Sequence, residues 1–142
     1  MKLYILVLLV TVTALTGCKK DKVSDNDINN QKIQGKWDLV LTRSVTFNNG
    51  KKVEDEEKIA SGTTIFEFAG NTLNYIEKSS SKQRYSFTIE GDEMIMRGDR
   101  NGAVFFKFKF NSDTQLELSQ RETETINNVT YEESFTYVMN KL

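Results

Sequence analysis

The stretch IQGKWDLVLT, residues 33–42, indicates the fold more clearly than any other part of the chain. Gly35 allows the chain to turn sharply, and Trp37, the only tryptophan, follows two positions later. From Trp37 onward, Leu39 and Leu41 occupy alternate positions. This alternation is typical of a β-strand that packs one face against a core. It predicts a first strand over residues 36–47, which ends at the hairpin-forming Asn49-Gly50.

Seven further segments show the same two-residue alternation, bounded by glycine, asparagine, aspartate or serine. They cover residues 64–68, 73–75, 85–89, 94–96, 104–110, 116–118 and 131–139. Short connections make neighbouring strands antiparallel, and eight such strands in chain order can close on themselves without an exposed edge. We therefore expect an all-β, eight-stranded antiparallel up-and-down β-barrel. A sandwich is the alternative, but the late part of the chain offers no long connection for its crossing strands.

The acidic segment 52–62 has a weak pattern and leaves two interpretations open. It either extends the hairpin that turns at Asn49-Gly50 or forms a long loop over one end of the barrel.

The N-terminus, residues 1–17, has the features of a secretory signal peptide: Lys2, an apolar run and small residues at its end. The apolar run 3–15 would rise about 20 Å as a helix, which is too short for a hydrocarbon core of about 30 Å. The following Leu15-Thr16-Gly17-Cys18 resembles the lipobox of bacterial lipoproteins. An ordinary signal peptide followed by an unrelated cysteine is the alternative.

The lipobox resemblance implies that the chain is cut before Cys18 and that Cys18 is acylated. Two or more acyl chains would attach the protein stably to a membrane. In the resembled family an aspartate after the cysteine favours retention in the inner membrane, whereas this chain has Lys19. The resemblance therefore implies a protein anchored by lipid to the outer membrane, on its periplasmic face or at the cell surface.

Residues 18–31 are almost entirely polar, which predicts a flexible tether between the anchor and a domain over residues 32–142. One helical turn over residues 28–34 is the exception that we expect. Asp25, Asp27 and Asn29 have the alternate spacing of a calcium loop, but Lys36 stands where such a loop needs a bidentate glutamate. We therefore expect no metal site here.

Gly35-Lys36-Trp37 resembles the Gly-x-Trp opening of the lipocalins, and residues 35–142 resemble the lipocalin-like domain of secreted bacterial lipoproteins. The resemblance implies that Trp37 plugs the closed end of the barrel. Lipocalins usually place an arginine or lysine from the last strand on this tryptophan, and Lys141 is the available residue. The Thr-Asp-Tyr motif and the cysteine pair of many lipocalins are absent.

The composition argues against several classes of function. A formal net charge of -1 gives no excess of Lys and Arg for binding nucleic acid. With no histidine, and with Cys18 acylated, the chain lacks an imidazole base, a thiolate nucleophile and the usual zinc ligands. We expect no enzyme, no cofactor and no metal. Glutamates in the expected strands are placed on the solvated outer face: Glu67, Glu77, Glu90 and Glu117.

Inward-facing aromatic residues are the candidate ligand-binding residues. They are Trp37, Phe66, Phe68, Tyr75, Tyr85, Phe87, Phe106, Phe108, Phe135 and Tyr137. An eight-stranded barrel either fills its interior with such side chains or leaves space for one small ligand. Met94 and Met96 are expected to fill gaps in the core.

Two functions follow from these two possibilities. The first is non-catalytic binding of a small apolar or amphipathic molecule in the barrel mouth, near residues 52–62. The second is a packed barrel that serves as a protein-interaction or envelope-scaffold module, with another envelope protein as its partner.

Overall fold

A computed structural model of the chain describes residues 24–78, 82–98 and 102–142. In these ranges it has one helix, α1 (Asp25–Ile33), and nine strands. The strands are β1 (Gly35–Asn48), β2 (Lys51–Ile59), β3 (Thr64–Ala69), β4 (Thr72–Glu77), β5 (Gln83–Glu90), β6 (Glu93–Arg97), β7 (Ala103–Ser112), β8 (Gln115–Ile126) and β9 (Val129–Lys141). The expected signal peptide and Cys18 lie outside the described residues, as does the tether up to residue 23. No helix among the described residues has the length and apolar character needed to cross a membrane.

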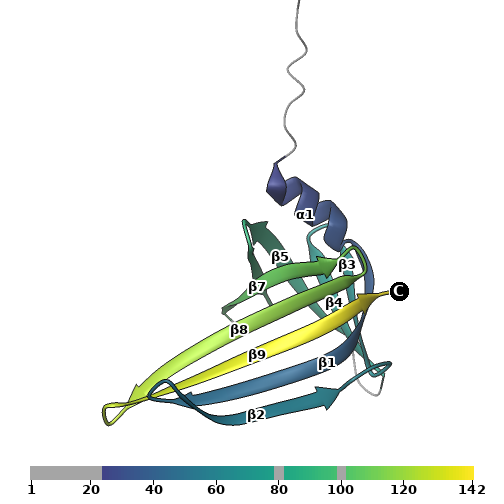
Figure 1. Cartoon of the computed structure of the whole chain (residues 1–142). Helices are drawn as coiled ribbons and strands as arrows, with labels where there is room; N and C mark the ends of the chain where they lie inside the picture. The colour runs from purple at the N-terminus through teal and green to yellow at the C-terminus, as the bar shows by residue number, and fades with distance from the viewer. Residues whose placement is uncertain (1–23, 79–81, 99–101) are drawn as a thin grey trace, which may run out of the picture.

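The strands form a closed, eight-stranded, up-and-down barrel, as the sequence predicts (Figure 1). From β3 to β9 each strand pairs antiparallel with the next, and β9 pairs with β1 to close the barrel. Along its other edge, β1 pairs first with β3 and then with β2. β2 and β3 thus occupy the place of one bent strand beside β1. The nine strands therefore form a barrel of eight.

Asp38 on β1 stabilises the turn that separates β2 from β3. Its carboxylate accepts hydrogen bonds from the Gly62 backbone N–H at 3.0 Å and from the Ser61 hydroxyl at 3.1 Å. Gly62 has a φ of +74°, which a glycine adopts without strain. The acidic segment therefore extends the hairpin as strand β2, and the interpretation as a long loop is wrong.

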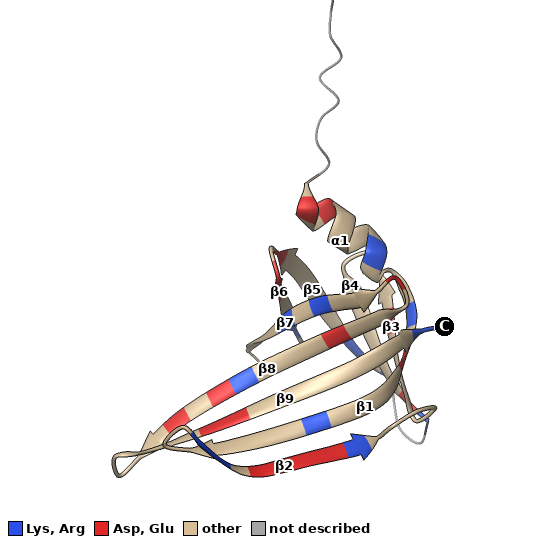
Figure 2. Cartoon of the chain, viewed as in Figure 1, with Lys and Arg blue, Asp and Glu red and all other residues tan. Residues whose placement is uncertain are grey.

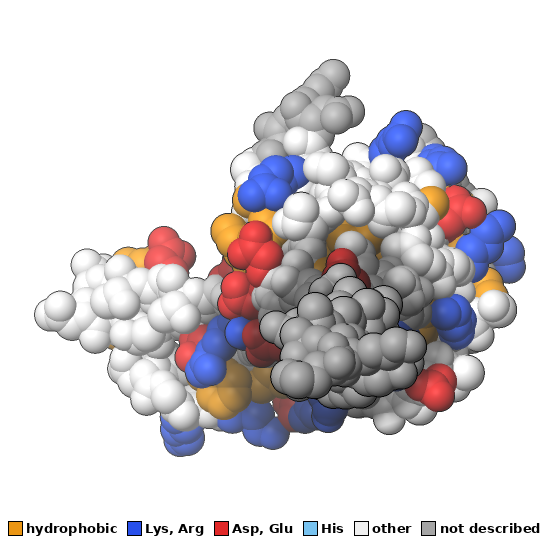
Figure 3. All heavy atoms as spheres, turned by 90° about the horizontal axis from the view of Figure 1, so that it is seen from above, with side chains coloured by type: hydrophobic (Ala, Val, Ile, Leu, Met, Phe, Trp, Pro, Cys, Tyr) orange, Lys and Arg blue, Asp and Glu red, His pale blue; other side chains and the backbone are white. Residues whose placement is uncertain are grey.

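The barrel has two unequal sides. β1 has 14 residues, β8 has 12 and β9 has 13, whereas β3 and β4 have 6 each and β6 has 5. The long strands and β2 continue past the open end as a four-stranded sheet in the order β2-β1-β9-β8 (Figure 1). We call this extension, residues 43–57 and 119–136, the arm. Seen from the α1 side, the arm stands out from the barrel body on one side (Figure 3).

Helix α1 covers the opposite end of the barrel, and the prediction of a flexible tether over residues 25–31 is wrong. Ser24 caps the helix: its hydroxyl accepts from the Asp27 N–H at 3.2 Å and donates to the Asp27 carboxylate at 2.7 Å. Asn26 accepts from the Gly91 N–H at 2.9 Å. The Ser24 cap is a local contact, whereas the contact of Asn26 depends on a turn 65 residues away, which a polar composition does not reveal.

Trp37 lies at the centre of the closed end and is 0% exposed. Its indole nitrogen donates to the Ile33 carbonyl at 2.7 Å. The Lys141 ammonium lies 5.1 Å from the centre of the Trp37 ring and donates to the Lys32 carbonyl at 3.1 Å. The tryptophan and the terminal cation therefore occupy the positions that the lipocalin resemblance implies.

The core continues from Trp37 toward the middle of the barrel. Phe68 and Phe87 pack edge to face with ring centres 5.4 Å apart, and Leu116 and Met139 are fully buried beside them. The core residues and the contacts that close the barrel all lie between residues 24 and 142. We therefore expect residues 24–142 to fold on their own.

Candidate functional site

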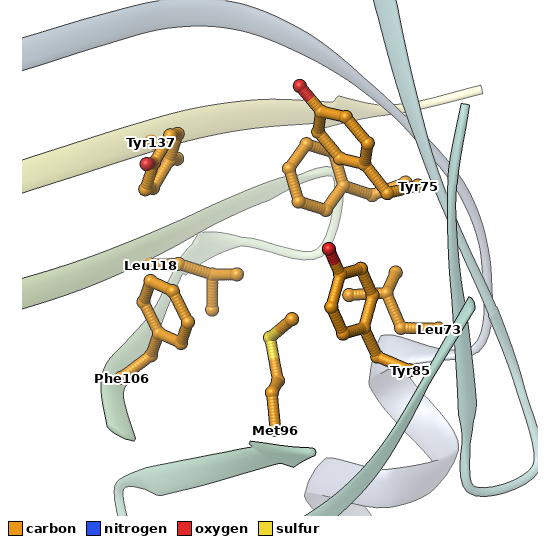
Figure 4. Close-up of a pocket in the computed structure, with 8 residues that line it drawn as sticks. Leu73, Tyr75, Tyr85, Met96, Phe106, Leu118 and Tyr137 are labelled. Atoms are coloured by element: carbon orange, nitrogen blue, oxygen red, sulfur yellow. The ribbon is translucent and has the colours of Figure 1, made fainter. Parts of the chain in front are cut away.

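The open half of the barrel contains an apolar cavity of about 190 Å³. Its walls come from seven strands, and their side chains point toward a common space (Figure 4). The lining residues are Phe66, Leu73, Tyr75, Tyr85, Met96, Phe106, Leu118 and Tyr137. An apolar cavity of about 150 Å³ is large enough for benzene, so this one has room for a small ring or the end of an alkyl chain.

Aromatic contacts hold the cavity walls in place. Phe66 and Tyr75 pack edge to face with ring centres 5.2 Å apart. On the other side, the rings of Phe106 and Tyr137 lie 6.2 Å apart. Such pairs restrict side-chain rotation beyond simple burial, so the space between them is largely preformed.

Three tyrosine hydroxyls lie at the cavity. The Tyr75 hydroxyl donates to the Glu77 carboxylate and the Tyr85 hydroxyl donates to the Gln83 side-chain carbonyl, each at 2.5 Å. The Tyr137 hydroxyl makes no hydrogen bond within the part of the chain that the structure describes. It is therefore available to a ligand.

Burial and the neighbouring Glu77 raise the pKa of Tyr75 to about 12. Burial also raises the pKa of Tyr137. Both phenols are therefore protonated at neutral pH, and the cavity presents hydroxyl groups rather than phenolate charges.

Glu77 corrects the expectation that all four strand glutamates face solvent. It is two residues beyond Tyr75 and lies opposite Thr64, which is 6% exposed. It therefore shares the inner face of β4. Glu67, in contrast, makes outer-face ion pairs with Lys36 and Lys82, each at 3.7 Å.

A polar groove of about 350 Å³ adjoins the cavity on the inner face of the arm. Tyr137 lines both spaces, so they adjoin at this side chain. The groove is lined by Thr42, Arg43, Ser44, Glu56, Lys58, Glu133, Phe135, Thr136 and Tyr137. Part of segment 52–62 thus borders the site, near the predicted position.

The ten aromatic residues predicted to bind ligand divide by depth. Phe66, Tyr75, Tyr85, Phe106 and Tyr137 line the cavity, and Phe135 lines the groove. Trp37, Phe68, Phe87 and Phe108 line neither and instead fill the closed half. These four side chains therefore do not border the candidate site, because alternation identifies the inward face but not the depth in the barrel.

Leu73, Met96 and Leu118 also line the cavity, although the sequence pattern did not select them as candidate ligand-binding residues. The sequence pattern selects aromatic residues as ligand contacts and predicts that Met96, like Met94, fills a gap in the core. Met94 is fully buried as expected, whereas Met96 faces the cavity. The alternation did place Leu73 and Leu118 in strands, so extending the choice to aliphatic residues would have found them.

In the described ranges 24–78, 82–98 and 102–142, no three His, Cys, Asp or Glu side chains are grouped in a way that could hold a metal ion.

A search of protein-family models and of curated proteins finds no match to this chain. The likeness that the structure establishes is therefore one of architecture: an all-β, lipocalin-like barrel, closed by a helix at one end and open to an apolar cavity at the other.

Proposed function

We propose that this protein is a lipid-anchored cell-envelope lipoprotein whose barrel binds one small apolar or amphipathic molecule without catalysing a reaction. The cavity in the open half carries the proposal. Its walls are apolar and largely preformed, it adjoins a groove at Tyr137, and the opposite end is sealed by Trp37 and α1. Binding sites for small molecules are usually concave, mostly apolar and equipped with a few polar groups, as here.

Mass spectrometry under native conditions tests ligand binding. Residues 24–142, produced in the protein's own host, are expected to carry a stoichiometric small molecule. An apo mass that stays unchanged after incubation with a lipid extract would contradict the proposal.

A pair of variants locates the bound molecule. Thr42→Trp places a bulky ring on the inner face next to Tyr137 and is expected to lower ligand occupancy at least tenfold. Ser134→Trp places the same ring on the outer face of the same sheet and is expected to leave occupancy unchanged. Circular dichroism checks that both variants remain folded. Equal occupancy in the two variants would exclude the barrel mouth.

The sequence Leu15-Thr16-Gly17-Cys18 supports the anchor, with the outer membrane as the proposed location. Cys18→Ala should move the full chain from the membrane fraction to the soluble fraction and abolish incorporation of labelled palmitate. A Cys18→Ala protein that still sediments with membranes would contradict lipid anchoring.

The edge of β2 favours a second role, as an envelope protein-interaction module. Among the described strands, β2 pairs only with β1, so its other edge is open, and Ile59 on it is 86% exposed. A photo-crosslinking residue at position 59 should then capture one discrete partner in the host. The same residue at exposed Thr88 should not. Identical patterns from both positions would argue against this role.

A further inference from the structure

The two faces of the arm differ in how their charges are compensated. On the outer face Asp55 pairs with Arg43 at 2.7 Å and with Lys52 at 2.8 Å, and Arg121 pairs with Glu132. The basic side chains of this face thus lie against carboxylates.

The inner face has a row of carboxylates without such partners. The strand register aligns Glu54 of β2, Thr46 of β1, Glu133 of β9 and Glu122 of β8. Among the described residues, no Lys or Arg nitrogen lies within ion-pairing distance of these three glutamates. Red bands along β2 and the outer halves of β8 and β9 mark the acidic side chains (Figure 2).

Lysines on the inner face do not neutralise this row. Lys58 lies nearer the barrel mouth and pairs with Glu56 at 3.1 Å. Lys51 lies beyond the row, opposite Asn48 near the tip. Glu124 is aligned with Lys51 across the strands, also on the inner face and nearer the tip than Glu133, and adds a further negative charge. The inner face therefore has an excess of negative charge.

This arrangement costs stability. Glu122 and Glu133 lie directly opposite each other on neighbouring strands, and like charges in this position are destabilising. The Ser44 hydroxyl donates to Glu133 at 3.4 Å, which is a weak hydrogen bond. A cation bound in the groove would relieve the repulsion.

The apolar cavity and the acidic row lie on one path. Tyr137 lines the cavity, and Phe135 and Glu133 follow on the same face of β9. Tyr137 lies four positions along the strand from Glu133, which corresponds to about 13 Å. A molecule with its apolar end at Tyr137 and about this length would place its other end over the row.

From this path we infer that the ligand is an elongated amphipathic cation, with its apolar end in the barrel cavity and an ammonium or guanidinium group over Glu133. The inference deepens the proposed function and rests on it. The Tyr137 ring, which lines both spaces, would contact the apolar end of the molecule.

Three probes with the same alkyl chain test the inference: decylamine, decanol and decanoate. Binding to residues 24–142, freed of host ligand, is measured by isothermal titration calorimetry at low ionic strength. Decylamine is expected to bind at least threefold more tightly than decanol, and decanoate more weakly than both. The preference for the amine should shrink as salt is added, because salt screens exposed charges.

A pair of single-residue variants assigns the preference to the inner face. Glu133→Gln keeps the shape of the side chain and is expected to reduce the preference for decylamine over decanol by about two- to fivefold, while leaving decanol affinity unchanged. Glu132→Gln removes a charge from the next residue, on the outer face, and is expected to leave the preference intact.

The outcomes separate this inference from the proposed function. If none of the probes binds, both are overturned. If decanol and decylamine bind equally, or decanoate binds most tightly, apolar binding stands and the cationic ligand is excluded. A preference for decylamine that Glu133→Gln does not alter, or that Glu132→Gln abolishes, also overturns the inference.

Discussion

The two ends of this barrel use the same strands for different purposes. At the closed end, Trp37 is fully buried and hydrogen-bonded, and Lys141 lies over its ring. At the open end, the strands enclose a cavity, leave the Tyr137 hydroxyl without a partner among the described residues, and bring Glu122 opposite Glu133. Packing and satisfied polar groups stabilise one end, whereas the other retains a hydroxyl without a partner among the described residues and two carboxylates without a basic partner, which a ligand can use.

Strand β9 shows that this division does not follow secondary-structure elements. Its last residues include Met139, fully buried, and Lys141, which closes the barrel. Tyr137 and Phe135, which come before Met139 on the same face, line the cavity and the groove. The closed core and the candidate site are therefore separated along the strand, and substitutions in the two parts should have different consequences.

The largest expected effect is at Trp37. Trp37→Ala removes a buried ring and the hydrogen bond to Ile33, and is expected to lower the free energy of unfolding by about 3–5 kcal/mol. Urea denaturation followed by circular dichroism measures the change. Phe135→Ala at the half-buried open end is the comparison and is expected to cost less than about 1.5 kcal/mol. Equal losses of unfolding free energy in Trp37→Ala and Phe135→Ala would contradict the view that the closed end carries most of the stability.

If Trp37→Ala does not fold, Trp37→Phe gives a milder test. It keeps most of the ring but removes the donor to the Ile33 carbonyl, and should cost about 1–3 kcal/mol because that carbonyl is left without its partner.

Lys141 should have the next largest effect. Lys141→Ala removes the cation over Trp37 and the donor to the Lys32 carbonyl, so we expect a loss of about 1–2 kcal/mol in the free energy of unfolding. Lys141→Arg keeps a cation and should recover part of this loss. Thermal unfolding of the three proteins provides the measurement, and an unchanged midpoint in Lys141→Ala would show that the closed end does not depend on the cation.

The sequence predicts the fold well because alternation and turn residues are local signals. All eight strand segments lie within strands of the barrel, and the closed up-and-down topology is confirmed. The break after β2 was not predicted, because it depends on hydrogen bonds from Ser61 and Gly62 to Asp38, more than twenty residues away. Helix α1 was largely missed for a similar reason: its hydrogen bond from the Gly91 N–H to Asn26 joins residues that are 65 positions apart in the sequence.

The site was predicted less completely than the fold. Period-two alternation identified the inward face and therefore Tyr75, Tyr85 and Tyr137. It gives no information about depth, so it also selects Phe87, which is buried in the core but does not line the cavity. The acidic row was also missed, because it depends on the register of four strands whose residues are distant in the sequence.

A smaller effect, of opposite sign, is expected on the inner face of the arm. Glu122→Gln keeps an oxygen that can accept the hydrogen bond from the Gln120 side chain, removes the repulsion with Glu133, and should raise the free energy of unfolding by about 0.3–0.5 kcal/mol at low salt. Glu117→Gln on the outer face of the same strand is the control, since Glu117 lies opposite Lys109 and Val138. Chemical denaturation with and without added salt tests this, and a destabilised Glu122→Gln would show that the like charges do not repel in the folded protein.

The smallest expected effect concerns the outer face of the arm, where Asp55 is paired. Hydrogen bonds from Arg43 and Lys52 hold the pKa of Asp55 well below its usual range. The pair therefore stabilises the folded protein above the unfolded-state pKa of about 3.9, and this contribution is lost as the pH falls below that value. Asp55→Asn should lower the melting temperature slightly at pH 7, and the two melting temperatures should converge toward about pH 2 as the wild-type carboxylate becomes protonated. Because the pair is solvent-exposed, the difference should also decrease with added salt. A difference independent of pH would mean that Asp55 acts through its shape rather than its charge, and the charge contrast between the two faces of the arm would then rest on the inner row alone.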